Sequence, residues 1–141
     1  MTHFVRRTIL TTVAVLAIAP AAAAVAAPVE VTAFTLSPSC THPGGTVTAN
    51  TTVQNTTLLP QTFYAQTRTT YYGYPVQTSG VYGPYSVPPL SSLSKSTPTT
   101  IPSNAPWGDY SVTFGIGPSS SSAMSWSTRT APLKVAPVPF C

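Results

Sequence analysis

The chain has 141 residues, only 6% of them charged, and its formal net charge is +4. Globular proteins carry about 25% charged residues, so hydroxyl and amide side chains must supply most of this protein's polar surface. After residue 26 its four cations, Arg68, Lys95, Arg129 and Lys134, are scattered along the sequence and form no basic cluster, which argues against nucleic acid as a partner.

The N-terminal segment has the order of a secretory signal peptide, from basic to apolar to small residues. Arg6 and Arg7 form the basic part, residues 9–19 are mostly apolar, and residues 21–27 are mostly alanine. The apolar part is shorter than the ~20 residues that a membrane-spanning helix needs. A cleaved signal is therefore favoured over a permanent membrane anchor.

The cleavage site is expected where this segment ends. Ala24-Val25-Ala26 fits the A-x-A pattern that precedes signal-peptide cleavage. We expect a cleavable signal-peptide helix over residues 1–26, bacterial in style, and one mature domain over residues 27–141. The protein is then secreted and extracellular, with no membrane attachment after cleavage.

Short β-favouring runs recur after the signal peptide, separated by Pro, Gly, Asn and Ser, and no stretch has sustained helical periodicity. All of the chain's 16 prolines except Pro20 lie in this part, which excludes long helices. About seven or eight short strands of this kind predict an all-β, antiparallel β-sandwich. The expected strands cover residues 29–36, 46–53, 61–70, 93–101, 110–116, 123–130 and 133–138, with a hairpin or irregular edge strands in residues 71–90.

The two cysteines, Cys40 and Cys141, both lie in the predicted mature domain. Disulfides form and persist outside the cytoplasm, so an even pair predicts one disulfide between them. Free thiols, or a bond to another chain, are the alternatives. On chain-entropy grounds, closing a loop of roughly 100 residues stabilises a fold by up to ~4.7 kcal/mol.

Residues that could carry acid–base chemistry are scarce. The predicted mature domain has one histidine, His42, one aspartate, Asp109, and one glutamate, Glu30. A paired-carboxylate site or a Ser-His-Asp triad would have to recruit these residues, and no G-x-S-x-G motif is present. Metal sites need three or four ligands, which is nearly all that the domain could supply. We therefore expect no enzyme, no cofactor and no metal.

Six of the seven tyrosines lie between residues 64 and 85. Tyrosine is amphipathic and loses little rotamer entropy on binding. The segment therefore predicts an aromatic binding face for a cell-surface polysaccharide or a partner protein. The alternative is cross-strand aromatic pairing that stabilises an edge hairpin. The candidate binding residues are Tyr71, Tyr72, Tyr74, Tyr82 and Tyr85.

Residues 105–114, APWGDYSVTF, place a glycine-containing turn before Tyr110 and an alternating apolar strand after it. This pattern resembles the start of strand F in secreted bacterial immunoglobulin-like and fibronectin-like domains, although Val112 stands where antibody domains have a cysteine. The resemblance implies a tyrosine corner, in which the Tyr110 hydroxyl bonds to nearby backbone. It also implies that the first and last strands run side by side and parallel, which would bring Cys40 and Cys141 together.

The function expected from these features is that of a secreted, non-catalytic binding or structural domain. It would recognise a cell-surface polymer or a partner protein through the tyrosine-rich segment. The alternative is a small secreted inhibitor or a carrier of a small apolar ligand.

Overall fold

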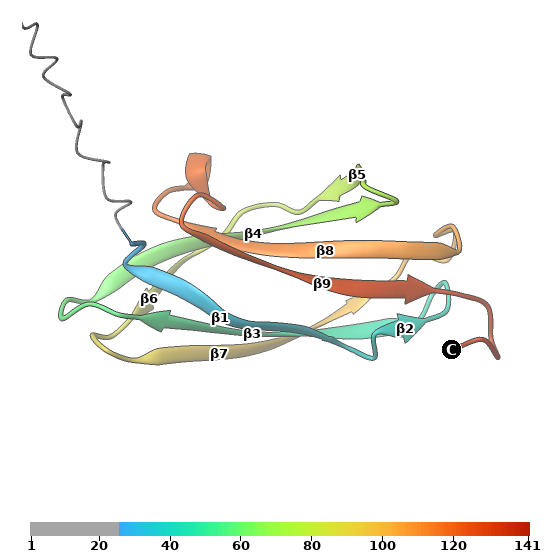
Figure 1. Ribbon diagram of the computed structural model, residues 1–141, viewed down its shortest axis with the longest axis horizontal. Coiled ribbons are helices and arrows are strands. Elements are labelled where there is room, and N and C mark those ends of the chain that lie inside the picture. The colour runs from blue at the N-terminus through green and yellow to red at the C-terminus, as the bar shows by residue number, and fades with distance from the viewer. Residues whose placement is uncertain (1–25) are drawn as a thin grey trace, which may run out of the picture.

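The computed structural model describes residues 26–141, which form two stacked β-sheets (Figure 1). Residues 1–25, and with them nearly all of the predicted signal peptide, lie outside the described part of the chain. Within that part, no helix is long and apolar enough to cross a membrane. The predicted all-β, antiparallel sandwich is confirmed.

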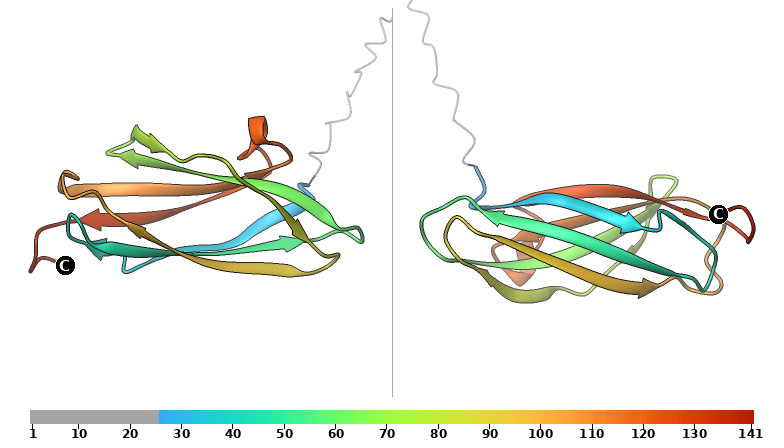
Figure 2. Two further views of the ribbon diagram at one scale, coloured as in Figure 1. Left: turned by 180° about the vertical axis from the view of Figure 1, so that it is seen from behind. Right: turned by 90° about the horizontal axis from the view of Figure 1, so that it is seen from below.

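The smaller sheet has the strand order β1-β3-β7, and the larger has the order β2-β9-β8-β4-β5, with β6 also paired to β4. Figure 2 shows the two sheets from behind and from below. The strands are β1 (Val29–Ser37), β2 (Cys40–Thr41), β3 (Thr46–Asn55), β4 (Gln61–Tyr71), β5 (Tyr74–Thr78), β6 (Tyr82–Val87), β7 (Ser92–Thr100), β8 (Gly108–Gly117) and β9 (Ser127–Val135).

The expected division of the last part of the chain into two strands is wrong. The strands expected at 123–130 and 133–138 are a single strand, β9, which follows a short 3-10 turn at Ser120–Ser122. Pro132, between the two expected strands, lies within β9 opposite Ser111 of β8. The other edge of β9 has no paired strand at this position, because β2 pairs with β9 only at Lys134 and Val135. A proline is tolerated there because no partner strand needs its N–H.

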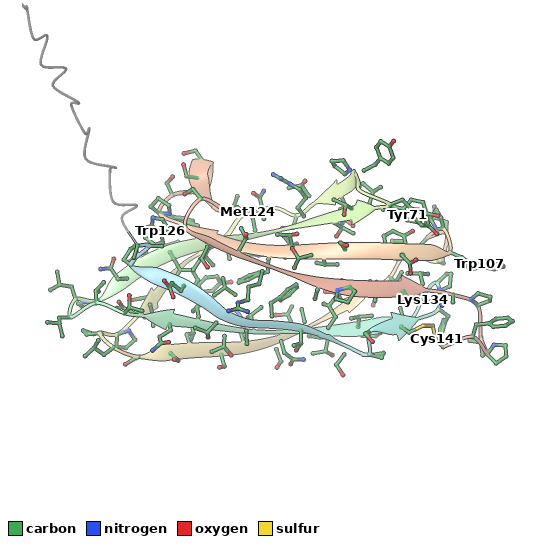
Figure 3. The ribbon with its side chains drawn as sticks, in the orientation of Figure 1. Tyr71, Trp107, Met124, Trp126, Lys134 and Cys141 are labelled. Atoms are coloured by element: carbon green, nitrogen blue, oxygen red, sulfur yellow. A yellow bond between two sulfur atoms is a disulfide. The ribbon has the colours of Figure 1, made fainter. Side chains whose placement is uncertain are left out.

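The two-residue strand β2 was not predicted as a separate element. After β1 the chain crosses to the larger sheet, where β2 runs parallel to β9, with Cys40 opposite Lys134. Cys40 forms a disulfide with Cys141, and their Cα atoms are 5.5 Å apart (Figure 3). The predicted intramolecular disulfide is confirmed, and the alternatives of free thiols and a bond to another chain are wrong.

The core lies between the sheets, where alternate side chains of each strand point inward. Phe34 of β1 stacks on Phe114 of β8 in the opposite sheet, with ring centroids 5.6 Å apart. Burying a Val, Ile or Phe side chain stabilises a fold by about 1.5–3 kcal/mol, so this apolar layer holds the sheets together. The buried hydrophobic residues are Val29, Val31, Phe34, Val47, Val53, Phe63, Ala65, Val87, Ile116, Ala123, Ala131, Leu133, Val135 and Ala136.

Asn55, at the end of β3, is a fully buried polar residue. Its Nδ2 donates to the carbonyls of Leu59 at 2.7 Å and Pro88 at 3.1 Å. Its Oδ1 accepts from the backbone N–H of Thr57 at 2.9 Å and from the Thr57 hydroxyl at 2.8 Å. A buried amide needs such partners, and these bonds tie the loop after β3 to the segment that follows β6.

Strands β1 and β9 lie beside each other on one side of the sandwich, which we call the closed side. Two side chains of β9 bond there to the backbone of β1. The Nε of Arg129 donates to the carbonyl of Val31 at 2.7 Å, and the N–H of Val31 donates to the hydroxyl of Ser127 at 3.0 Å. Side-chain bonds thus join the two sheets where strand pairing does not.

Candidate functional site

The opposite side of the sandwich lies between β7, at the end of the smaller sheet, and strands β5 and β6, at the end of the larger one. Two adjoining cavities of about 310 Å³ and about 470 Å³ lie there. We call them together the open groove. Volumes of about 300–1,000 Å³ are usual for ligand sites. The cavities share the lining residues Phe34, Ala49, Thr67, Tyr82 and Thr99.

Strand β7 leaves this side open because of its inward-facing residues. All nine residues of β7 are exposed. Leu93 lines the groove and is followed, at alternate positions, by Lys95, Thr97 and Thr99. Short hydroxyl side chains and an ammonium group do not fill the gap between the sheets as Leu or Phe would. The groove between the two sheets therefore opens to solvent along β7.

The floor of the groove is apolar and aromatic. Phe34 and Phe114 line it as a stacked pair, and Phe63 packs on Tyr85 with ring centroids 5.5 Å apart. Ala65 of β4 lies in the same cavity. Contiguous apolar surface of this kind at an open edge is typical of a place where a ligand or a partner binds.

Three of the five candidate tyrosines line the open groove. Tyr85 lies in the smaller cavity, Tyr71 in the larger one, and Tyr82 in both. Tyr72 and Tyr74 are separate from it, at the tip of the β4–β5 hairpin, where they are 61% and 76% exposed. The structure therefore brings Tyr71, Tyr82 and Tyr85 together along one groove and leaves the other two outside it.

Near the hairpin tip, the cross-strand aromatic pairing joins Tyr71 of β4 to Tyr110 of β8, with ring centroids 4.7 Å apart. Tyr71 lies opposite Tyr74, and its ring is 4.5 Å from the ring of Tyr72 in an edge-on arrangement. Tyr72 has a φ of 47° and Gly73 a φ of 83°. Tight hairpins with two successive left-handed residues usually have Asn-Gly at these positions. The backbone of Tyr72 is therefore strained, and this conformation places its ring at the tip.

Tyr110 makes the bond that the family resemblance implied. Its hydroxyl donates to the carbonyl of Pro106 at 2.7 Å, and the nearby Tyr71 hydroxyl donates to the carbonyl of Trp107 at 2.9 Å. Partial burial raises the pKa of Tyr110 above its usual value of 10.0, and the neighbouring phenols of Tyr71 and Tyr72 add to the shift. Tyr110 therefore holds the loop before β8 in place as a neutral phenol.

Lys95 lines the open groove and was not predicted from the sequence as a binding residue. Its Nζ lies 4.7 Å from the centroid of the Tyr85 ring and 3.5 Å from the Tyr85 hydroxyl. No acidic residue of the described chain lines either cavity. Lys95 alternates with Leu93 and Thr97 along the strand and therefore shares a face with them. This pattern in the sequence could have indicated its place in the groove.

Comparisons with models of known protein families and with curated protein sequences give no match. Solved structures with a similar fold include an alkylpurine DNA glycosylase, AlkC, from Pseudomonas fluorescens, with 13% identity and a TM-score of 0.61. A cycloisomaltooligosaccharide glucanotransferase from Paenibacillus sp. has 19% identity and a TM-score of 0.61. The sporulation control protein Spo0M from Bacillus subtilis has 15% identity and a TM-score of 0.59.

These similarities cover most of this chain and smaller parts of the other proteins. The matches cover 80%, 76% and 82% of this chain, but 32%, 14% and 52% of those three chains, in the same order. At such low identity the likeness establishes the β-sandwich fold alone, and the activities of those proteins do not transfer with it.

The described residues offer little for catalysis or metal binding. Within residues 26–141, no group of three or more His, Cys, Asp or Glu side chains could hold a metal ion. The sulfur of Cys40 is bonded in the disulfide and cannot act as a thiolate. The open groove is lined by aromatic rings, methyl groups, hydroxyls and the ammonium group of Lys95.

Proposed function

We propose that the protein is a secreted, non-catalytic, immunoglobulin-like domain that binds a ligand with an apolar body in the open groove. The observation that carries this proposal is the cavity between β7 and β6, whose floor is aromatic. The disulfide supports secretion, because disulfides form and persist in oxidising compartments. The scarcity of acid–base groups supports a binding role over an enzymatic one.

The open groove favours the carrier form of this function over recognition by a flat aromatic face. Flat sugar-binding faces present exposed rings, whereas Phe34 and Phe63 lie 7% and 3% exposed at the bottom of a channel. When apolar atoms of a ligand enter such a channel, the ligand and the channel wall both lose contact with water. Each CH₂ group buried in this way contributes about 0.8 kcal/mol to the free energy of binding. A narrow, apolar ligand therefore gains most from this site.

The test blocks the groove without touching the core. Thr97 is exposed and lines the groove, so Thr97→Trp fills the channel. Ser96, its neighbour on β7, bonds outward to Asn50, so Ser96→Trp adds the same ring on the outer face. We expect the unaltered protein and Ser96→Trp to bind the neutral apolar dye Nile red, measured by its fluorescence, and Thr97→Trp to lose most of this binding. Equal binding by the two variants would contradict the proposal.

A second candidate function is supported by the exposed rings at the hairpin end. Tyr72, Tyr74 and Trp107 are 61%, 76% and 63% exposed, and the Tyr72 ring lies close to Gly108, next to Trp107. Exposed rings of this kind fit the predicted recognition of a cell-surface polysaccharide. Replacing Tyr72 and Tyr74 by Ser should then reduce retention on cell-wall polysaccharide in a pull-down, whereas Thr97→Trp should not.

A further inference from the structure

Lys95 places a positive charge inside a groove that is otherwise neutral. On β7 the outward positions belong to Ser94 and Ser96, which bond to Thr52 and Asn50 of β3. Lys95 points the other way, to the floor on which Tyr85 packs. The two acidic residues of the described chain lie elsewhere, Glu30 opposite Gln54 on β3 and Asp109 opposite Lys134 on β9.

The ammonium group has bonding capacity left over. An ammonium carries three N–H donors, and the Tyr85 hydroxyl, 3.5 Å away, accepts at most one of them. The Tyr85 ring attracts the cation but supplies no net negative charge. The Tyr85 hydroxyl keeps its own hydrogen as a donor. Lys95 and Tyr85 together thus present several donors and a positive charge at one point of the groove wall.

The space beside this point is long and apolar. The smaller cavity runs from Lys95 over the Phe34–Phe114 pair to Tyr82. Tyr82 also lines the larger cavity, which continues past Val76 to Ile101 at the hairpin end. A ligand with its charged group at Lys95 would therefore have an apolar channel for the rest of its length.

An added peptide strand fits this surface less well. Main-chain recognition would use the free edge of β7, because β7 pairs only with β3 among the described strands. Pro98 lies two residues before the end of that strand and has no N–H to donate. Proline and lysine on an edge strand are features that oppose strand addition. The occupant is better matched to the channel than to the edge.

We propose that the open groove selects a free, singly charged anionic amphiphile, a long-chain carboxylate, whose carboxylate bonds to Lys95 and Tyr85 and whose chain lies on the aromatic floor. This inference rests on the proposed function, since it names the class of ligand that the groove takes. Charge-assisted hydrogen bonds are roughly twice as strong as neutral ones, so the head group orients the ligand and the chain supplies most of the affinity.

The test uses three probes of matched chain length that differ in head-group charge: dodecanoate, dodecanol and dodecyltrimethylammonium. Their affinities for the full protein are measured by calorimetry at neutral pH, low salt and concentrations below micelle formation. We expect dodecanoate to bind most tightly and dodecyltrimethylammonium least tightly. Thr97→Trp should weaken all three probes, which places them in the groove.

Variants of Lys95 then test the charge itself. Lys95→Met should weaken dodecanoate binding about fivefold, the size expected of a partly exposed ion pair, and change dodecanol binding less than about twofold. Lys95→Glu should reverse the order of the two charged probes. Lys134→Met removes the same charge from β9, outside the groove, and should leave all three affinities unchanged.

Two results separate the inference from the proposed function. If the unaltered protein binds the three probes equally and Lys95→Met changes nothing, the selection of anions is wrong, while binding in the apolar groove stands. If neither the probes nor Nile red bind, or if Thr97→Trp has no effect on them, the proposed function fails and the inference fails with it.

Discussion

On the closed side of the sandwich, Arg129 of β9 bonds to the backbone of Val31 at 2.7 Å, whereas on the open side Lys95 of β7 meets the hydroxyl of Tyr85 at 3.5 Å. Both cations reach from one sheet toward the other. Arg129 satisfies a backbone carbonyl that strand pairing leaves free. Lys95 satisfies no backbone group in its contact with Tyr85 and retains donors for another molecule. The same type of charge thus holds the two sheets together on one side and is left with free donors in the groove on the other.

The residues around these cations follow the same division. On the closed side, Ser127 bonds to the β1 backbone, and the Cys40–Cys141 disulfide ties the end of the chain to β2. On the open side, Thr97 and Thr99 line a groove instead of filling it. Substitutions on the closed side should therefore change stability, and substitutions on the open side should change binding.

Removal of the disulfide is expected to have the largest effect on stability. The two cysteines are separated by 101 residues in sequence, and a loop of this length corresponds to roughly 3–5 kcal/mol. Cys40→Ala combined with Cys141→Ala should lower the free energy of unfolding by that amount, measured by urea denaturation. A loss of less than about 1 kcal/mol would show that the bonds of Arg129 and Ser127 hold this side without the disulfide.

A matched pair of substitutions compares the two sides directly. Arg129→Met breaks a charge-assisted bond to a buried residue and should cost about 1.5–2 kcal/mol of unfolding free energy. Lys95→Met removes an equal charge from the open side and should change stability by less than about 0.5 kcal/mol. Urea denaturation of both variants measures the difference. Equal losses of unfolding free energy would mean that Lys95 also stabilises the fold.

A substitution of Tyr110 is expected to lower the stability less than Arg129→Met does, and it adds a pH dependence. Tyr110→Phe removes the bond to Pro106 and should cost about 1 kcal/mol. Because the pKa of Tyr110 is raised in the folded state, the folded protein holds this proton more tightly than the unfolded chain does. The associated stability is complete below pH 10.0 and is lost as the pH rises through the folded-state pKa.

Thermal unfolding of Tyr110→Phe and of the unaltered protein across this alkaline range checks the pH dependence. The gap between their stabilities should narrow as the pH rises. A gap that stays constant would show that the phenol of Tyr110 does not titrate differently in the two states.

The strands and the disulfide could be predicted because they depend on local features. Alternation in residues 46–53 and 110–116 survives in β3 and β8, since each strand buries one face. Cysteine parity was sufficient for the pairing of Cys40 with Cys141. The continuous β9 could not be predicted, because Pro132 is tolerated only since the pairing of β2 with β9 begins beyond it, at Lys134.

The open groove depends on contacts between distant segments, so it could be predicted only in part from the sequence. The tyrosine cluster indicated a binding surface, but the sequence could not show that Tyr82 and Tyr85 face β7 while Tyr72 and Tyr74 lie at a hairpin tip. The role of Lys95 depends on Tyr85 and on the absence of acids from the lining, and both are set by the stacking of the two sheets.

The buried amide of Asn55 has a consequence for production of the protein in eukaryotic cells. Asn55-Thr56-Thr57 matches the acceptor sequence for N-glycosylation. In the folded domain the Asn55 side chain is inaccessible, and its bonds to Leu59 and Thr57 occupy both ends of the amide. A glycan at this site can be attached only before the loop closes, and it would then keep the loop open. Chains glycosylated at Asn55 would therefore lack the closed loop of the folded domain.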